Sequence, residues 1–307
     1  MAKRKRTGFF IKLFSAVAIV VAVLFGVYFA IDKIVVPRYF KDYGINNMHD
    51  LVSMVKTLYN SPDEEDIITN GFTQRNEKDA IEKLIAINVP ETNEGSGILD
   101  FFAITESVDK EDLVKGDLEL TDREMAAILD QMLESGVLAE KLPDIKYLDT
   151  IKMNVLELII SPEKMVDGSG NVTYATDKAN VSFTFKVNTQ AIRSQIASEM
   201  QTPIFLLNMI MPETLYITID YQMEQREDYW VINSSNIGLN GRTAKDSNIL
   251  LNLLIEFIFP VEDNMTVDKL AQECGNILLE GVEIIGTMQV KHGIGPNNSN
   301  GVVLTIE

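Results

Sequence analysis

An uncharged apolar stretch near the N-terminus constrains this chain more than any other feature. Leu13 through Ile31 contains no charged residue. As a helix it would extend about 28 Å at ~1.5 Å per residue, which matches the ~30 Å hydrocarbon core of a bilayer. We therefore predict that residues 9–31 form a transmembrane helix that contacts the lipid bilayer, preceded by a basic tail over residues 1–8.

Charge is distributed unevenly around this predicted span. Residues 1–33 carry six basic residues against one acid, a net of +5, so the rest of the chain carries −23 and the total is −18. Because basic residues flank the cytoplasmic side of a span, we predict a single-pass protein of the cell membrane with a cytoplasmic N-terminus and an extracellular C-terminal domain. The acidic exported part repels phosphate backbones, so no nucleic acid is expected as a partner, whereas a basic partner stays open.

A cleaved signal peptide is the competing interpretation of the same segment. The apolar region of a signal peptide has ~7–15 residues and ends at small residues spaced A-x-A. Here the run is longer, and Tyr28-Phe29-Ala30 places a bulky ring where a small side chain is needed. These features favour an uncleaved signal anchor. A lipoprotein anchor is excluded because the single cysteine, Cys274, is far from the span.

Hydrophobic periodicity divides the remainder into two regions. Residues 32–117 hold two amphipathic helical patterns, at 42–59 and 77–87, and a loop at 90–97, and are predicted to be a membrane-proximal helical region and linker. Residues 118–307 are predicted to be an α+β ectodomain. It opens with a capping box, Thr121 with Glu124, at the start of a helix that Gly136 ends.

Alternating apolar and polar residues predict antiparallel strands in the ectodomain. The clearest alternation covers residues 181–187 and 215–223. Further strands are predicted at 145–160, 229–239, 287–291 and 302–306, and helices at 189–200, 244–259 and 266–280. The expected fold class is α+β, with one N-terminal transmembrane helix followed by a long antiparallel sheet that has helices packed on one face.

Residues that commonly carry catalysis are few. A nucleophilic site needs a base beside its nucleophile, yet the only histidines are His49 and His292, and Cys274 falls inside a predicted helix. The segment 167–171 departs from a calcium loop, because Val172 stands where such a loop has glycine, and is better interpreted as a turn between strands. We predict no enzyme, no metal and no cofactor, although acid–base chemistry by two of the 45 acidic residues stays open.

Apolar surface is the remaining candidate for function. Residues 249–259 are apolar except for Asn252 and Glu256, so this segment is either a buried core helix or one wall of an apolar groove. A groove between sheet and helix would be lined by Phe183, Phe185, Ile217, Ile219, Leu250, Leu254 and Phe257. We predict a membrane-anchored extracytoplasmic binding or scaffolding protein with an envelope protein as its partner. The alternative is a lipid-binding or lipid-transfer module that holds an acyl chain in this groove.

The layout also resembles a known kind of protein. A basic N-terminus, one span, the helix start L-T-D-R-E-x-x-A-I-L at residues 120–129 and antiparallel strands with a late helix are similar to uncharacterised signal-anchored envelope proteins of Gram-positive bacteria, some with ectodomains like the tubular lipid-binding (TULIP-like) domains. The likeness covers residues 10–33 and 118–307. It implies an extracytoplasmic role in lipid handling or envelope assembly and transfers no catalytic residue.

Overall fold

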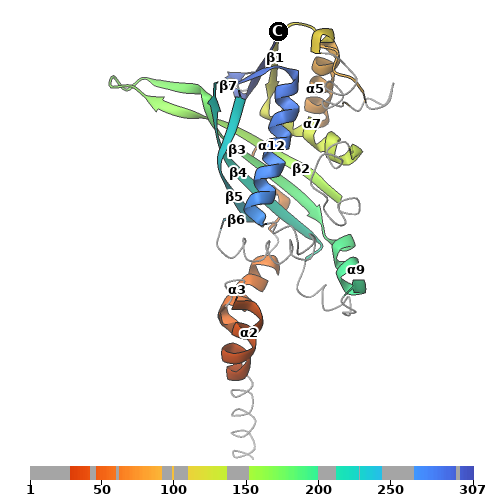
Figure 1. Cartoon of the computed structure of the whole chain (residues 1–307), viewed down its shortest axis with the longest axis vertical. Helices are drawn as coiled ribbons and strands as arrows, with labels where there is room; N and C mark the ends of the chain where they lie inside the picture. The colour runs from red at the N-terminus through yellow and green to blue at the C-terminus, as the bar shows by residue number, and fades with distance from the viewer. Residues whose placement is uncertain are drawn as a thin grey trace, which may run out of the picture. The chain divides into compact units, whose positions relative to one another are not determined.

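The computed structural model describes residues 28–41, 46–59, 62–91, 99, 110–136, 152–199, 212–227, 229–243, 266–294 and 298–307 (Figure 1). The chain divides into two compact units, Met1–Lys56 and Thr57–Glu307. All but the last four residues of the predicted span 9–31 lie outside the described ranges. Within those ranges, no helix combines the length and the apolar character that crossing a membrane requires.

The described part of the first unit is helical. A π-helix, η1 (Ile31–Val35), leads into α2 (Val36–Phe40), and α3 (Met48–Tyr59) begins in this unit, inside the predicted helix at 42–59. The backbone N–H of Met48 donates to Asp32 Oδ1 at 2.6 Å and fixes the start of α3 to the preceding helix. Tyr28, Phe29, Ile34 and Val35 are all exposed.

Two antiparallel sheets form the frame of the second unit. The larger has the order β2-β3-β4-β5-β6, with β2 Lys152–Val166, β3 Val172–Asn188, β4 Thr214–Arg226, β5 Tyr229–Leu239 and β6 Arg242–Thr243. The smaller has the order β1-β8-β7, with β1 Gly116–Thr121, β7 Thr287–Ile294 and β8 Ser299–Ile306. The predicted α+β class is confirmed, and β4 with β5 and β7 with β8 form antiparallel hairpins.

The prediction of one long sheet is wrong, because β7 and β8 pair with a third strand, β1, in a separate sheet. Strand β1, which the sequence pattern did not predict, pairs with β8 from Gly116 to Thr121. Gly301 makes this pairing possible: a Cβ atom there would lie 2.1 Å from the carbonyl oxygen of Leu120. The three strands therefore close into a sheet of their own.

Helices pack on these sheets through apolar faces. Helix α7 (Asp122–Ser135) lies against β2, α5 (Gln74–Ala86) lies against α7, and α12 (Val267–Ile285) crosses the larger sheet with its main contacts on β5 (Figure 1). The predicted capping box is confirmed: Glu124 N donates to Thr121 Oγ1, Thr121 N donates to Glu124 Oε2, and Gly136 ends α7 with a φ of 82°. The remaining short helices are α4 (Glu64–Ile67), α9 (Gln190–Glu199) and the 3-10 turn η3 (Lys110–Asp112).

Candidate functional site

The structure places four of the seven predicted groove residues together on one face of the larger sheet. Phe183 pairs with Ile219, and Phe185 pairs with Ile217 in the adjacent row of β3 and β4. The rings of Phe183 and Phe185 stack with centroids 6.0 Å apart. Phe183 is buried, whereas Phe185 and Ile219 are partly buried against the core. The other three groove residues, Leu250, Leu254 and Phe257, and the predicted helix at 244–259 lie outside the described residues.

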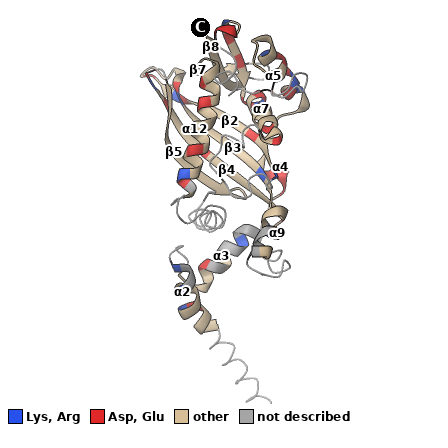
Figure 2. Cartoon of the chain, turned by 45° about the vertical axis from the view of Figure 1, so that its right-hand side comes forward, with Lys and Arg blue, Asp and Glu red and all other residues tan. Residues whose placement is uncertain are grey.

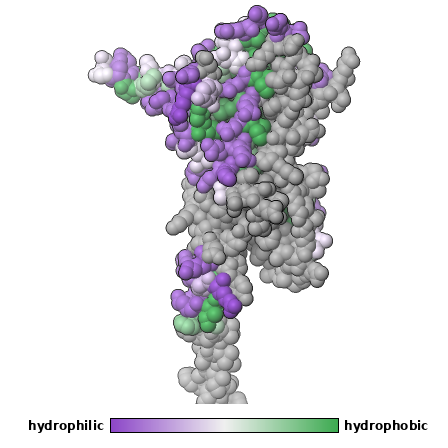
Figure 3. All heavy atoms as spheres, viewed as in Figure 1, coloured by the Kyte–Doolittle hydropathy of each residue, from purple (hydrophilic) through white to green (hydrophobic). Residues whose placement is uncertain are grey.

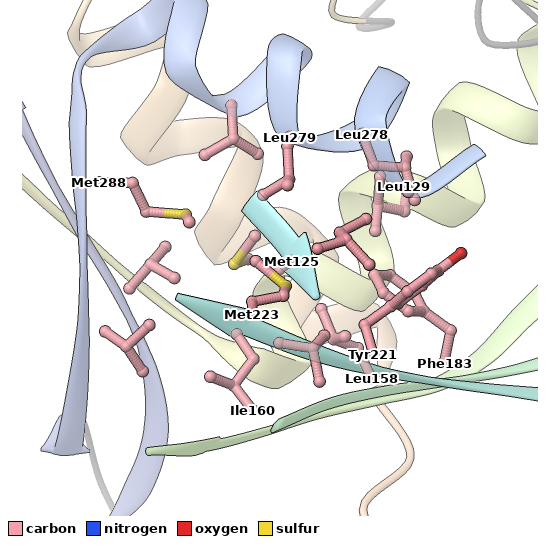
Figure 4. Close-up of a pocket in the computed structure, with 16 residues that line it drawn as sticks. Met125, Leu129, Leu158, Ile160, Phe183, Tyr221, Met223, Leu278, Leu279 and Met288 are labelled. Carbon is pink, nitrogen blue, oxygen red and sulfur yellow. The ribbon is translucent and has the colours of Figure 1, made fainter. Parts of the chain in front are cut away.

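This face borders a small apolar cavity beneath α12 (Figure 4). Its volume is about 50 Å³, and its walls come from α7, α12 and strands of both sheets, including Met125, Leu158, Phe183, Tyr221 and Leu279. Pockets that hold a drug-sized ligand measure about 300–1,000 Å³. The described walls therefore enclose less space than an acyl chain would fill.

Helix α12 lies close against the sheet that it crosses. Tyr221 Oη donates to the Ala271 carbonyl at 2.6 Å, and at the other end of the helix the backbone N–H of Trp230 donates to Glu283 Oε1 at 2.7 Å. A Cβ on Gly275 would lie 2.4 Å from Ile232 Cδ1 and 2.9 Å from the Tyr221 ring. Glycine at this position thus lets the helix backbone approach the sheet to near van der Waals contact.

Cys274, one turn from Ala271 on the same helix, is an unreactive thiol. Burial, together with the neighbouring Glu273, raises its pKa to about 12. The thiolate is the nucleophilic form, so a thiol with this pKa is almost entirely protonated at neutral pH. This environment suits a packing role for Cys274.

A hairpin arm, residues 163–177 at the turn end of β2 and β3, extends beyond the sheet (Figure 1). The β3–β4 pairing begins only at Lys178, so the arm is two-stranded. Met165, Val166, Val172 and Tyr174 are 47%, 62%, 45% and 38% exposed, and they are four of the seven exposed large hydrophobic residues that the structure describes in the second unit. In Figure 3, hydrophobic side chains lie among hydrophilic ones on the surface of the arm.

The arm has a closed turn and a fixed base. Asp167 accepts hydrogen bonds from the backbone N–H groups of Ser169 and Asn171 at 2.8 and 2.9 Å, which confirms the predicted turn. At the base, the Tyr174 ring stacks on His292 with centroids 3.8 Å apart, and His292 Nδ1 lies 2.6 Å from Asn300 Oδ1. The sequence analysis predicted the turn but not the arm. The apolar residues directly on both sides of the polar turn are the pattern that could have indicated it.

A buried pair of carboxyl groups joins β2, α7 and the segment 62–73. Glu157, 3% exposed, accepts hydrogen bonds from Thr69 N and Oγ1 at 2.8 and 2.9 Å and also from Asn70 N. Asp122, 4% exposed, accepts from Asn70 Nδ2 at 2.8 Å. Burial raises the pKa of Asp122 to about 6, and the nearby negative charge of Glu157 contributes to that rise.

Metal-binding geometry does not occur in the described ranges: no three residues of the His, Cys, Asp and Glu types converge there. His49 lies on α3 and His292 lies beneath the arm, in different elements.

Comparison of the chain with protein-family models, with curated proteins and with solved structures finds no significant match. The surfaces described above are therefore the candidates for a functional site.

Proposed function

We propose that this chain is a membrane-anchored extracytoplasmic binding or scaffolding protein of the cell envelope that holds a protein partner through the hairpin arm and catalyses no reaction. The observation that carries the proposal is the concentration of exposed hydrophobic side chains on the arm. Exposed apolar groups gathered in one place on a soluble surface are typical of interaction sites.

The arm favours a protein over a bilayer as its partner. The turn at its end is Asp167-Gly168-Ser169-Gly170-Asn171, and the exposed apolar residues lie behind it. Insertion into lipid would bury the Asp167 carboxylate and the turn backbone before Val166 and Val172 reached hydrocarbon, which is costly. A protein cleft can clasp the sides of the arm and leave the turn in water.

Charge adds a second criterion for the partner. The chain beyond residue 33 carries a net charge of −23, and acidic side chains occur along α7 and α12 (Figure 2). Complementary potentials speed encounter and suppress wrong partners. The partner that fits is an envelope protein with an apolar cleft and basic residues around it.

The anchor in this proposal rests on the sequence of residues 9–31 and on the positive-inside rule. Tyr28, Phe29 and Ile34 give further support, because these large hydrophobic side chains are 51%, 56% and 60% exposed on the described part of the first unit. Protease added to intact cells should digest the C-terminal part and spare the N-terminal tail; a protected C-terminal part would contradict the topology.

Photo-crosslinking in the native host tests the arm directly. A photoreactive residue at position 172 should form an adduct with a protein of one defined mass. The substitution Val166→Asp should remove that adduct, because a carboxylate would have to enter the apolar contact. Thr173→Asp, on the neighbouring exposed position of the arm, serves as the matched control and should retain it. Adducts with lipid, or protein adducts that Val166→Asp leaves unchanged, would contradict the proposal.

A lipid-binding module is the second candidate, because α12 and the apolar face of the larger sheet enclose a cavity. The volume of about 50 Å³ is too small for an acyl chain unless the helix moves outward. Native mass spectrometry of residues 40–307 decides between the candidates. Copurifying stoichiometric lipid would favour the lipid module, and a lipid-free protein would favour partner binding.

A further inference from the structure

The face of the larger sheet opposite α12 carries two adjacent rows of small polar residues, which we call the polar sheet face. Each row crosses β2, β3, β4 and β5 through residues that are Cα partners: Ser161, Asn180, Gln222 and Ser234 in one row, and Ile159, Ser182, Asp220 and Asn236 in the other. Strand geometry spaces the rows about 7 Å apart and makes each about 14 Å wide. The same residues border a hollow of about 340 Å³.

This composition is unusual for the interior of four neighbouring strands. Asn and Asp are depleted in strands, where β-branched and aromatic residues fit the pleated surface better. Seven of the eight positions are nevertheless Ser, Asn, Gln or Asp. Residues that lower strand stability recur on this one face, and this repetition indicates a role other than folding.

The polar groups of this face are only partly used within the protein. Ser182 Oγ donates to Asp220 Oδ1 at 2.6 Å, and Ser234 Oγ donates to Gln222 Oε1 at 3.1 Å. The side chains of Asn180 and Asn236 make no hydrogen bond with any residue in the described ranges, and both are exposed. The hollow therefore offers a ligand the amide donors and acceptors of Asn180 and Asn236 and the second carboxylate oxygen of Asp220.

We propose that the polar sheet face binds a neutral glycan chain. Hydroxyl and amide groups on successive sugar units can both donate and accept, which matches a grid in which Ser, Asn and Gln do the same. The single carboxylate, Asp220, can accept from two neighbouring hydroxyl groups once Ser182 turns aside. The site is independent of the hairpin arm and of the partner proposed for it.

Charge and polarity argue against other ligand classes. The two rows contain no Lys or Arg, and the exported part of the chain is strongly acidic, so a phosphate-rich polymer would be repelled. Ile159 is the single apolar residue that projects from the two rows, so the face offers little to a lipid. A basic peptide could pair with Asp220 alone and would leave the amides of Asn180 and Asn236 without a specific role.

Binding of the full chain, solubilised in detergent, to insoluble neutral polysaccharides tests the proposal. The probes are chitin, cellulose and cell-wall glycan stripped of phosphate polymers, with polyphosphate beads and poly-lysine beads for the two charged classes. The double variant Asn180→Ala/Asn236→Ala should weaken binding to the preferred neutral probe at least tenfold. Thr287→Ala/Gln289→Ala, which removes two exposed polar side chains from β7, is the matched control and should bind as the wild type does.

Retention on a neutral probe that soluble oligosaccharide displaces and that only the Asn180/Asn236 variant loses, at an unchanged unfolding midpoint, supports the site. Absence of binding to all three neutral probes overturns it. Equal binding by both double variants, or preferential retention on polyphosphate or poly-lysine, overturns it as well. None of these readouts depends on the protein partner of the arm.

Discussion

The two faces of the larger sheet are covered by different chemistry. On the inner face, Leu158, Phe183 and Tyr221 are buried beneath α7 and α12. On the outer face, one end is covered through polar contacts: Glu157 binds the turn at Thr69 and Asn70, and Lys186 pairs with Glu64 of α4 at 2.6 Å. The other end of the outer face is the open, polar hollow.

This contrast separates the residues that fix the fold from those that are free to bind. Burial of apolar surface is non-directional and scales with area, so the inner face supplies most of the stability of the unit. The polar contacts of the outer face position the segment 62–73 with little net stabilisation. The hollow contributes least, which leaves its residues available for recognition.

Substitutions at neighbouring residues of β3 that lie on opposite faces should differ most in the free energy of unfolding that they cost. Phe183→Ala opens a cavity beside Tyr221, whose ring packs edge-on against Phe183 with centroids 5.8 Å apart. We expect a loss of about 3–5 kcal/mol in the free energy of unfolding. Ser182→Ala on the outer face removes one part-buried hydrogen bond, to Asp220, and should cost about 1 kcal/mol or less. Equal costs in urea denaturation would refute the assignment of the two faces.

The buried Asp122 should make stability depend on pH between about 4 and 6. Its pKa is raised from 3.8 to about 6 in the folded state, so the folded protein binds a proton that the unfolded chain has released. The free energy of unfolding should therefore fall by about 1–3 kcal/mol as pH rises through this window. At pH 7 this loss of stability is complete.

Asp122→Asn isolates this effect, because the amide does not titrate. The variant should lose the difference in unfolding free energy between pH 4 and pH 7 that Asp122 produces. Asp177→Asn, at an exposed position of the arm, is the control and should preserve it. If both variants keep the wild-type pH profile, another group is responsible for the dependence.

The hydrogen bond from Tyr221 to α12 should have a smaller effect. Tyr221→Phe keeps the ring against Gly275 but leaves the Ala271 carbonyl without this donor. The expected loss is about 0.5–1.5 kcal/mol. Hydrogen exchange of the α12 amides should rise at the same time, since this contact fixes one end of the helix. Unchanged exchange would mean that apolar packing alone holds the helix.

The sequence predicted local structure where the signal was local. Thr121 and Glu124 stand three residues apart, so the capping box was readable, and the alternation along residues 181–187 and 215–223 predicted the strands β3 and β4. Strand β1 was missed because Gly116–Thr121 is short and gains its order from β8, far away in the chain. The polar sheet face was missed for a similar reason: its residues occupy four strands, and only the register brings them together.

Substitutions to residues that favour strands should show whether the polar residues of this face lower the free energy of unfolding. Asn180 and Asn236 lie on β3 and β5, and neither side chain bonds to another described residue. Threonine fits a pleated surface better than asparagine on a scale that spans about 1 kcal/mol. Asn180→Thr and Asn236→Thr should therefore each raise the free energy of unfolding by a few tenths of a kcal/mol. Thr184→Asn, the reverse change at a buried outer-face position of β3, should lower it by more, because an amide would then be buried without its partners. If both Asn→Thr changes destabilise the protein, these two residues serve the fold, and the contrast between the hollow and the rest of the sheet fails.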